Sequence, residues 1–318
     1  MHGKSGPYPL FTLLVFLALL LTLAAVVLSA WLRLDSIGLG CADWPACFGQ
    51  LPVHDSTAAP RTAAGLVHRF TASLLGLIVV IITIQALRGR RPPGVGVVAP
   101  LAVFALTVFL SVLGYSTPSP DLPAVTFGNL TGGMAMLALL WWIGQRAVQP
   151  VGPLDSETLS LRPWLRVGLL VVVTQIALGA ITSARFAGPS CTQLPGCSGH
   201  VPQLAELAQG LDLFEHLAVD ARGHVVTGAI EKTMHLTHRV VALCTLLYLG
   251  WLALRALSLP RLRNTALVLS CILLLQLAAG SGAVLGGLPL PLVTVHNALA
   301  ALLLLAVVNL NHLATSAH

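Results

Sequence analysis

Eight apolar runs, each long enough to cross a lipid bilayer, dominate this sequence. A transmembrane helix needs about 20 predominantly apolar residues. Only 9% of the residues are charged, whereas soluble domains carry about 25%. Backbone polar groups cannot stay unpaired in lipid, so the runs predict helices. The sequence thus predicts an all-α integral membrane protein with spans near 10–31, 64–87, 94–116, 123–145, 164–184, 233–257, 264–286 and 291–313.

Basic residues gather on one side of these expected spans and acidic residues on the other. By the positive-inside rule the basic side faces the cytoplasm, which predicts a bacterial inner-membrane protein with both termini cytoplasmic. The net charge of +6 is then explained by the orientation of the protein in a lipid bilayer, so it does not indicate a nucleic-acid partner. The marker residues are Lys4, Arg88, Arg90, Arg91, Arg146, Arg162, Arg166, Arg255, Arg261 and Arg263.

Motifs recur between the two halves of the chain. Cys41 and Cys47 reappear 150 residues later as Cys191 and Cys197, and "VHRF" at 67–70 reappears as "THRV" at 237–240. Likewise, "AVTFGNLTGG" at 124–133 is similar to "LVTVHNALAA" at 292–301. The link between the halves is polar and contains proline. We therefore expect two pseudo-repeated four-helix bundles, 1–150 and 151–318.

Both cysteine pairs fall on the expected outer side, where disulfides can form. Each pair could close a small ring that staples its loop, because a bridge restricts the unfolded chain. A redox pair that exchanges electrons or thiols is an open alternative. Zinc binding is less favoured, because no C-x2-C pair is present.

Three histidines lie within the apolar runs at similar expected depth: His68, His238 and His296. Ionisable residues inside a membrane are costly and are usually functional. Two imidazoles on facing helices can hold a haem iron from both sides, so His238 and His296 are the expected ligands of haem b. Arg239 could pair with a haem propionate.

Other interpretations of these residues stay open. A membrane histidine can simply hydrogen-bond a neighbouring helix, and His235 lies one turn from His238 as an alternative ligand or a supporting partner. Gly179 and Gly280 suit close approach of a flat cofactor, but they equally suit close packing of helices.

Taken together, these motifs resemble those of the haem A synthase family of cytochrome-oxidase assembly enzymes. The resemblance covers nearly the whole chain. It is carried by "GLGCADWPACFG", "HRF", "CTQLPGCSG", "HLTHRV" and "VTVHNALAALLLL".

The resemblance implies oxidation of the C8 methyl group of haem O to a formyl group, giving haem A. It implies haem b in the second half, held by His238 and His296, and haem O in the first half, where His68 is an iron ligand and Arg69 also binds cofactor. Cys41 and Cys47 would assist electron or haem transfer. Water would supply the oxygen, so an electron acceptor of unspecified identity is required.

The same resemblance implies partners: a farnesyltransferase that makes haem O, and cytochrome oxidase assembly factors. Homo-oligomerisation is left open.

The first half departs from the family pattern at two places. Asn129 stands where the family has a second histidine, and Gly65 stands where it has a glutamate. Asn129 could hydrogen-bond a water or ligand over an iron with one open axial position, so His68 and Asn129 are the expected catalytic residues. The departures equally favour a non-catalytic haem-binding or haem-transfer protein. A membrane thiol oxidoreductase is a further alternative, based on the two cysteine pairs.

Overall fold

A computed structural model describes residues 8–36, 63–116, 122–148, 153, 155–220 and 225–315. Within these ranges the named elements are all helical, which confirms the expected all-α class. The elements are α1 (Pro9–Ser36), α2 (Ala63–Leu87), α3 (Val98–Ser116), α4 (Pro123–Val148), α5 (Ser156–Ala184), the 3-10 turn η1 (Gly188–Ser190), α6 (Leu204–Gly210), α7 (Ala229–Leu257), α8 (Arg263–Leu285) and α9 (Leu290–Leu313).

Among the described residues, seven helices are long and apolar enough to cross a membrane: α1, α2, α4, α5, α7, α8 and α9. They indicate a membrane-embedded, multi-pass protein. The third expected span falls on α3, whose apolar part, Val98–Gly114, belongs to a shorter class of 10–17 residues. This length is at the short end of the roughly 17–25 residues that transmembrane helices use.

Helix α5 begins eight residues before its expected apolar run. Asp155 precedes its first turn, and the carboxylate accepts hydrogen bonds from the Thr158 backbone N–H at 2.6 Å and from its hydroxyl at 2.9 Å. A capped polar segment therefore extends the helix beyond its apolar part. Hydropathy alone could not place this start, because a cap is a hydrogen bond and not an apolar residue.

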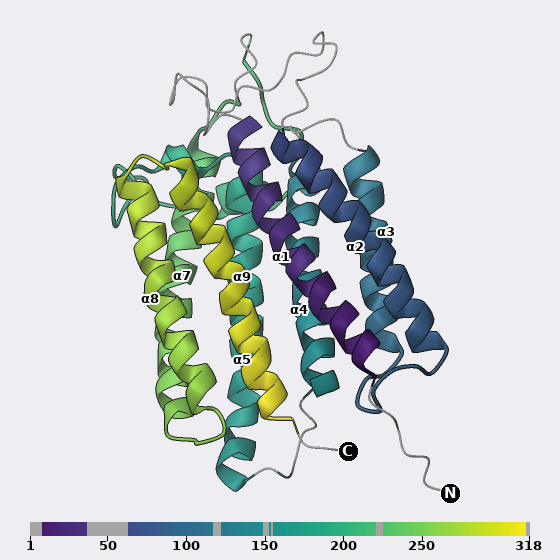
Figure 1. Cartoon of the computed structure of the whole chain (residues 1–318). Coiled ribbons are helices and arrows are strands. Elements are labelled where there is room, and N and C mark those ends of the chain that lie inside the picture. The colour runs from purple at the N-terminus through teal and green to yellow at the C-terminus, as the bar shows by residue number, and fades with distance from the viewer. Residues whose placement is uncertain are drawn as a thin grey trace, which may run out of the picture.

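The same pattern of neighbours occurs twice along the chain. Helix α1 packs on α2 and α4, and α3 packs on both α2 and α4; correspondingly, α5 packs on α7 and α9, and α8 packs on both α7 and α9. Helices α4 and α9 contact each other, α4 also contacts α5, and α9 also contacts α1. Figure 1 shows that α1 begins and α9 ends at the same end of the bundle. We call the opposite end, where 185–228 connect α5 to α7, the loop end.

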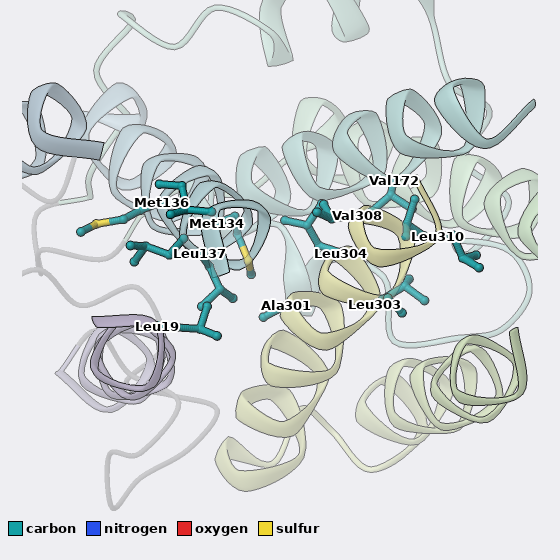
Figure 2. Packing of buried hydrophobic residues seen from close by; sticks show 14 of the residues in the cluster. Leu19, Met134, Met136, Leu137, Val172, Ala301, Leu303, Leu304, Val308 and Leu310 are labelled. Atoms are coloured by element: carbon teal, nitrogen blue, oxygen red, sulfur yellow. The ribbon is translucent and has the colours of Figure 1, made fainter. Parts of the chain in front are cut away.

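One apolar cluster joins the two sets of helices. Leu137 of α4, Val172 of α5 and Leu304 of α9 belong to it and are almost fully buried. Figure 2 shows Val172 and Leu304 near each other on α5 and α9, and Leu19 of α1 near Leu137 of α4. The cluster fixes the helices around the cavity described next.

Candidate functional site

A cavity of about 510 Å³ lies among α5, α7, α8 and α9, and α1 and α4 contribute further wall residues. Its size is within the range of about 300–1,000 Å³ that small-molecule and cofactor sites have. Met134, Val172 and Leu303, labelled in Figure 2, line its apolar wall. Leu243 of α7 and Leu277 of α8 also line it and are 57% and 50% exposed, so the cavity reaches the lipid-facing surface.

The structure brings His238 and His296 to this one cavity, from α7 and α9. His235 lines it as well, is 6% exposed, and has a buried Nδ1 without a hydrogen-bond partner. Nδ1 of His296 is likewise buried and without a partner. Buried polar atoms normally find a partner, so these nitrogens have unused hydrogen-bonding capacity.

Each of the two imidazoles packs against a glycine and a glutamine of the neighbouring helix. Gln175 Nε2 lies 3.1 Å from His238 Nδ1, and Gln276 Nε2 lies 3.3 Å from His296 Nε2. A Cβ added at Gly179 would lie 3.1 Å from His238 Cε1, and one at Gly280 would lie 2.9 Å from His296 Cε1. Neither glutamine was predicted from the sequence, although a polar residue inside an apolar run can indicate a functional site.

Arg239 of α7 contacts the loop that carries the second cysteine pair. Its guanidinium donates to the backbone carbonyls of Gln193, Gly196 and Cys191 at 2.6, 3.0 and 2.5 Å. Leu194 and Pro195, in the same loop, line the cavity. Arg239 therefore holds this loop as a wall of the site, with its Nε buried and without a partner.

The second cysteine pair forms a disulfide between Cys191 and Cys197, and each residue is 2% exposed. Thiol exchange requires access to the sulfur, so this burial favours the staple interpretation for the second pair. The first pair, Cys41 and Cys47, lies outside the described residues.

Arg33 of α1 also lines the cavity and was not among the expected site residues. Its Nη1 donates to the Ser183 hydroxyl of α5, and its Nη2 is buried without a hydrogen-bond partner. An arginine at the acidic end of the first span goes against the positive-inside distribution, which is the signal that could have identified it.

His68, Arg69 and Asn129 do not line this cavity. His68 and Arg69 lie in the second turn of α2, where Arg69 is exposed and His68 is partly exposed, and Asn129 is partly buried in α4. The repeat aligns Gly128 with His296. A Cβ at Gly128 would lie 2.8 Å from Leu113 Cδ2, so α3 closely covers this side of α4.

A polar layer covers the loop end of α7. Thr233 donates to Glu206 at 2.5 Å, and His200 Nε2 lies 2.8 Å from the Thr233 hydroxyl and 3.2 Å from the Glu206 carboxylate. The hydrogen bond from Thr233 is the main cause that lowers the pKa of Glu206 below 4.5, and the Gln203 N–H and His200 add to it. These contacts fix α6 on α7.

The donor set suits a macrocycle better than a bare ion. Across the part of the chain that the structure describes, no three His, Cys, Asp or Glu side chains gather as a bare metal ion would need. Two imidazoles suffice for haem iron, because the porphyrin supplies the remaining ligands.

Comparison with known proteins adds to this geometry. A family model described as "Cytochrome oxidase assembly protein" (COX15-CtaA) matches residues 12–308. A protein of Shewanella oneidensis named heme A synthase is 32% identical, over 95% of this chain and 96% of its own length. A protein of Shouchella clausii with the same name is 26% identical, over 57% and 62% respectively. The chain therefore belongs to the COX15-CtaA family of cytochrome oxidase assembly proteins.

Proposed function

We propose that this chain is a haem A synthase, which oxidises the C8 methyl group of haem O to a formyl group for cytochrome oxidase biogenesis. The observation that carries the proposal is the shared cavity of His238 and His296, reached from the lipid-facing surface. A hydrophobic, lipid-soluble macrocycle fits that access. The name of the Shewanella oneidensis relative supports the same activity.

The resident cofactor in this proposal is haem b, held by His238 and His296 in the second half. The unpartnered Nδ1 of His296 and the glycines beneath both rings support the assignment. When bound, haem b would supply a centre that accepts and passes on electrons. The residues of the chain orient the imidazoles and exclude water from around them.

Two arginines provide positive charge for the carboxylate propionates at the edge of a haem. Arg33 and Arg239 are among the residues lining the cavity, and no aspartate or glutamate is among them. Guanidinium groups bind carboxylates through charge-assisted hydrogen bonds. Arg33 Nη2 is the donor best suited to a propionate, because the hydrogen bonds that Arg239 donates go to the disulfide loop.

Haem O is proposed to bind in the first half, 1–150, with His68 as an iron ligand and Arg69 and Asn129 nearby. This half and 151–318 are proposed to be two pseudo-repeated four-helix bundles, with α3 as the eighth span. The matching helix neighbours in the two halves support the duplication. The protein is proposed to lie in a bacterial inner membrane with both termini cytoplasmic.

A non-catalytic haem carrier of the same family is the second candidate. The presence of Asn129 where the family has a second histidine, and of Gly65 where it has a glutamate, favours it. In either case the proposed partners are the farnesyltransferase that supplies haem O and oxidase assembly factors.

Co-expression with a haem O source, followed by haem extraction and chromatography, separates the two candidates. A synthase converts haem O to haem A. A protein that purifies with haem, while the extract contains haem O and no haem A, is a carrier. A purified protein without a haem absorption band contradicts both.

A further inference from the structure

Two glutamines occupy matching places beside the two proposed haem ligands. Gln175 in α5 contacts the ring of His238 in α7, and Gln276 in α8 contacts the ring of His296 in α9. The helix pairs α5·α7 and α8·α9 are both in direct contact. The arrangement therefore occurs twice around one cavity.

Each glutamine stands four residues before the glycine that packs against the same imidazole. The segments read "QIALG" at 175–179 and "QLAAG" at 276–280. Residues four apart share one face of a helix. The glycine lets the ring approach the helix backbone, and the glutamine amide then meets a ring nitrogen.

The amides have unused hydrogen-bonding capacity. Oε1 of Gln175 and Oε1 of Gln276 are both buried without a hydrogen-bond partner. A side-chain amide carries two donors and one acceptor oxygen, and a half-turn about its last bond exchanges them. Each oxygen can therefore take the place of Nε2 beside its imidazole, and at Gln175 this exchange gives up the hydrogen bond from Nε2 to the His238 backbone carbonyl at 3.3 Å.

A metal-bound imidazole uses one nitrogen for the metal and carries a hydrogen on the other. An acceptor for that hydrogen orients the ring and makes it a stronger electron donor to the metal. The nearest ring nitrogens are Nδ1 of His238, 3.1 Å from Gln175 Nε2, and Nε2 of His296, 3.3 Å from Gln276 Nε2; Nε2 of His238 lies farther from Gln175 Nε2, at 3.5 Å. In each ring, one nitrogen can carry its hydrogen toward the amide while the other would bind the iron.

We propose that Gln175 and Gln276 are positioning residues that accept the imidazole N–H of His238 and His296 through Oε1. The proposal rests on the function proposed above, because it requires haem in this cavity. Both glutamines set the ring orientation, and through ligand basicity they hold the haem midpoint potential low.

The test is the midpoint potential of the purified, haem-loaded full chain, measured by spectroscopic redox titration. Gln175→Leu and Gln276→Leu remove the acceptor at similar size and should each shift the potential upward. Gln175→Glu and Gln276→Glu keep an acceptor oxygen at the same place, so their potentials should equal that of the parent or lie below it.

Gln145→Leu is the matched control. Gln145 of α4 is a buried membrane-helix glutamine whose Oε1 also lacks a partner, but it does not line the cavity. The proposal is overturned if the leucine variants shift no more than Gln145→Leu, or if leucine and glutamate variants shift alike.

Haem retention decides the cases in which a variant loses its haem and its potential cannot be measured. If a leucine variant loses haem, retention by the matching glutamate variant supports the proposal, and loss from both overturns it. A parent chain without haem overturns the proposed function and this proposal together. A haem-loaded parent whose potential is unaffected by any of the variants overturns this proposal alone.

Discussion

Glycine lies opposite the imidazoles of His238 and His296. Gly179 lies against His238 and Gly280 lies against His296, so the rings pack on helix backbone. A helix-interior glycine costs about 1 kcal/mol relative to alanine. At these two positions, glycine leaves room for the imidazole ring. Even a substitution by alanine should therefore disturb the packing of the ring.

Gly280→Ala should displace the His296 ring, because the new Cβ would lie 2.9 Å from Cε1. Overpacking of this kind costs roughly 1–3 kcal/mol. We expect a broadened or shifted haem spectrum and weaker haem retention, measured by visible absorption after purification.

Gly250→Ala is the control for that substitution. Gly250 is in α7, and a Cβ there would meet no atom within 4 Å. Alanine is the better helix former, so this variant should keep the parent spectrum and stability. Equal behaviour of the two variants would contradict the crowding at Gly280.

His296→Ala should abolish the low-spin haem b signal in a reduced-minus-oxidised spectrum, because it removes one of the two proposed iron ligands. His216→Ala, in the exposed connection between α6 and α7, serves as the control and should keep it. A parent-like spectrum from His296→Ala, in a protein that retains its helical circular dichroism, would show that His296 is not a ligand.

At the scale of elements, the polar layer of His200, Glu206 and Thr233 attaches α6 to α7. The pKa of Glu206 is lowered in the folded protein, chiefly by the Thr233 hydroxyl. Its stabilising contribution is therefore complete above the unfolded pKa of 4.5 and is lost as the pH falls through the lower folded value.

Glu206→Gln should accordingly lower the thermal unfolding temperature at pH 7 and lower it less near pH 3. Thermal unfolding followed by circular dichroism at the two pH values measures this difference. Glu215→Gln, at an exposed position beyond α6, is the control. An equal loss at both pH values would mean that the ionised carboxylate of Glu206 does not stabilise this layer.

Helix α1 shows how an element of one half completes a site in the other. Arg33, near its end, reaches the cavity and donates to Ser183 of α5. The contacts of α1 with α9 and of α4 with α5 hold the halves together. The cavity therefore depends on both halves, although its histidines come from one.

At the scale of the whole molecule, the direction of the helices gives a testable topology. Gln209, at the exposed end of α6, belongs to the loop end, and Ser258, between α7 and α8, belongs to the opposite end. A membrane-impermeant maleimide should label Gln209→Cys in intact spheroplasts, since the loop end is proposed to face outward.

Ser258→Cys should react only after the membrane is permeabilised, with labelling of the parent chain subtracted as background. The reverse pattern would overturn the proposed orientation. Labelling of both sites in intact spheroplasts would contradict a membrane crossing by α7.

Much of the fold could be predicted from the sequence, because lipid forces each apolar run to satisfy its own backbone hydrogen bonds. The predicted span 291–313 corresponds to α9 (Leu290–Leu313) within one residue. The predicted start of α5 was eight residues too late, because Asp155 caps a polar first turn. The third run corresponds to α3, whose apolar part is shorter than those of the seven long helices found among the described residues.

The candidate site was only partly predictable. His238 and His296 were identifiable because an imidazole in an apolar run is rare and costly. Gln175, Gln276 and Arg33 were not, because their role depends on which helix faces which. The contact of Arg239 with the disulfide loop likewise could not be read from its position next to His238.

The sequence by itself determined that this chain is a bundle of apolar helices, and it marked the two imidazoles. Both properties are local: burial of apolar side chains in lipid and the cost of an ionisable group there. Only the tertiary structure decided that those imidazoles share one cavity with two glutamines and an arginine of α1. Contacts between residues such as Arg33 and Ser183, 150 positions apart, arise from helix packing, and no local periodicity encodes them.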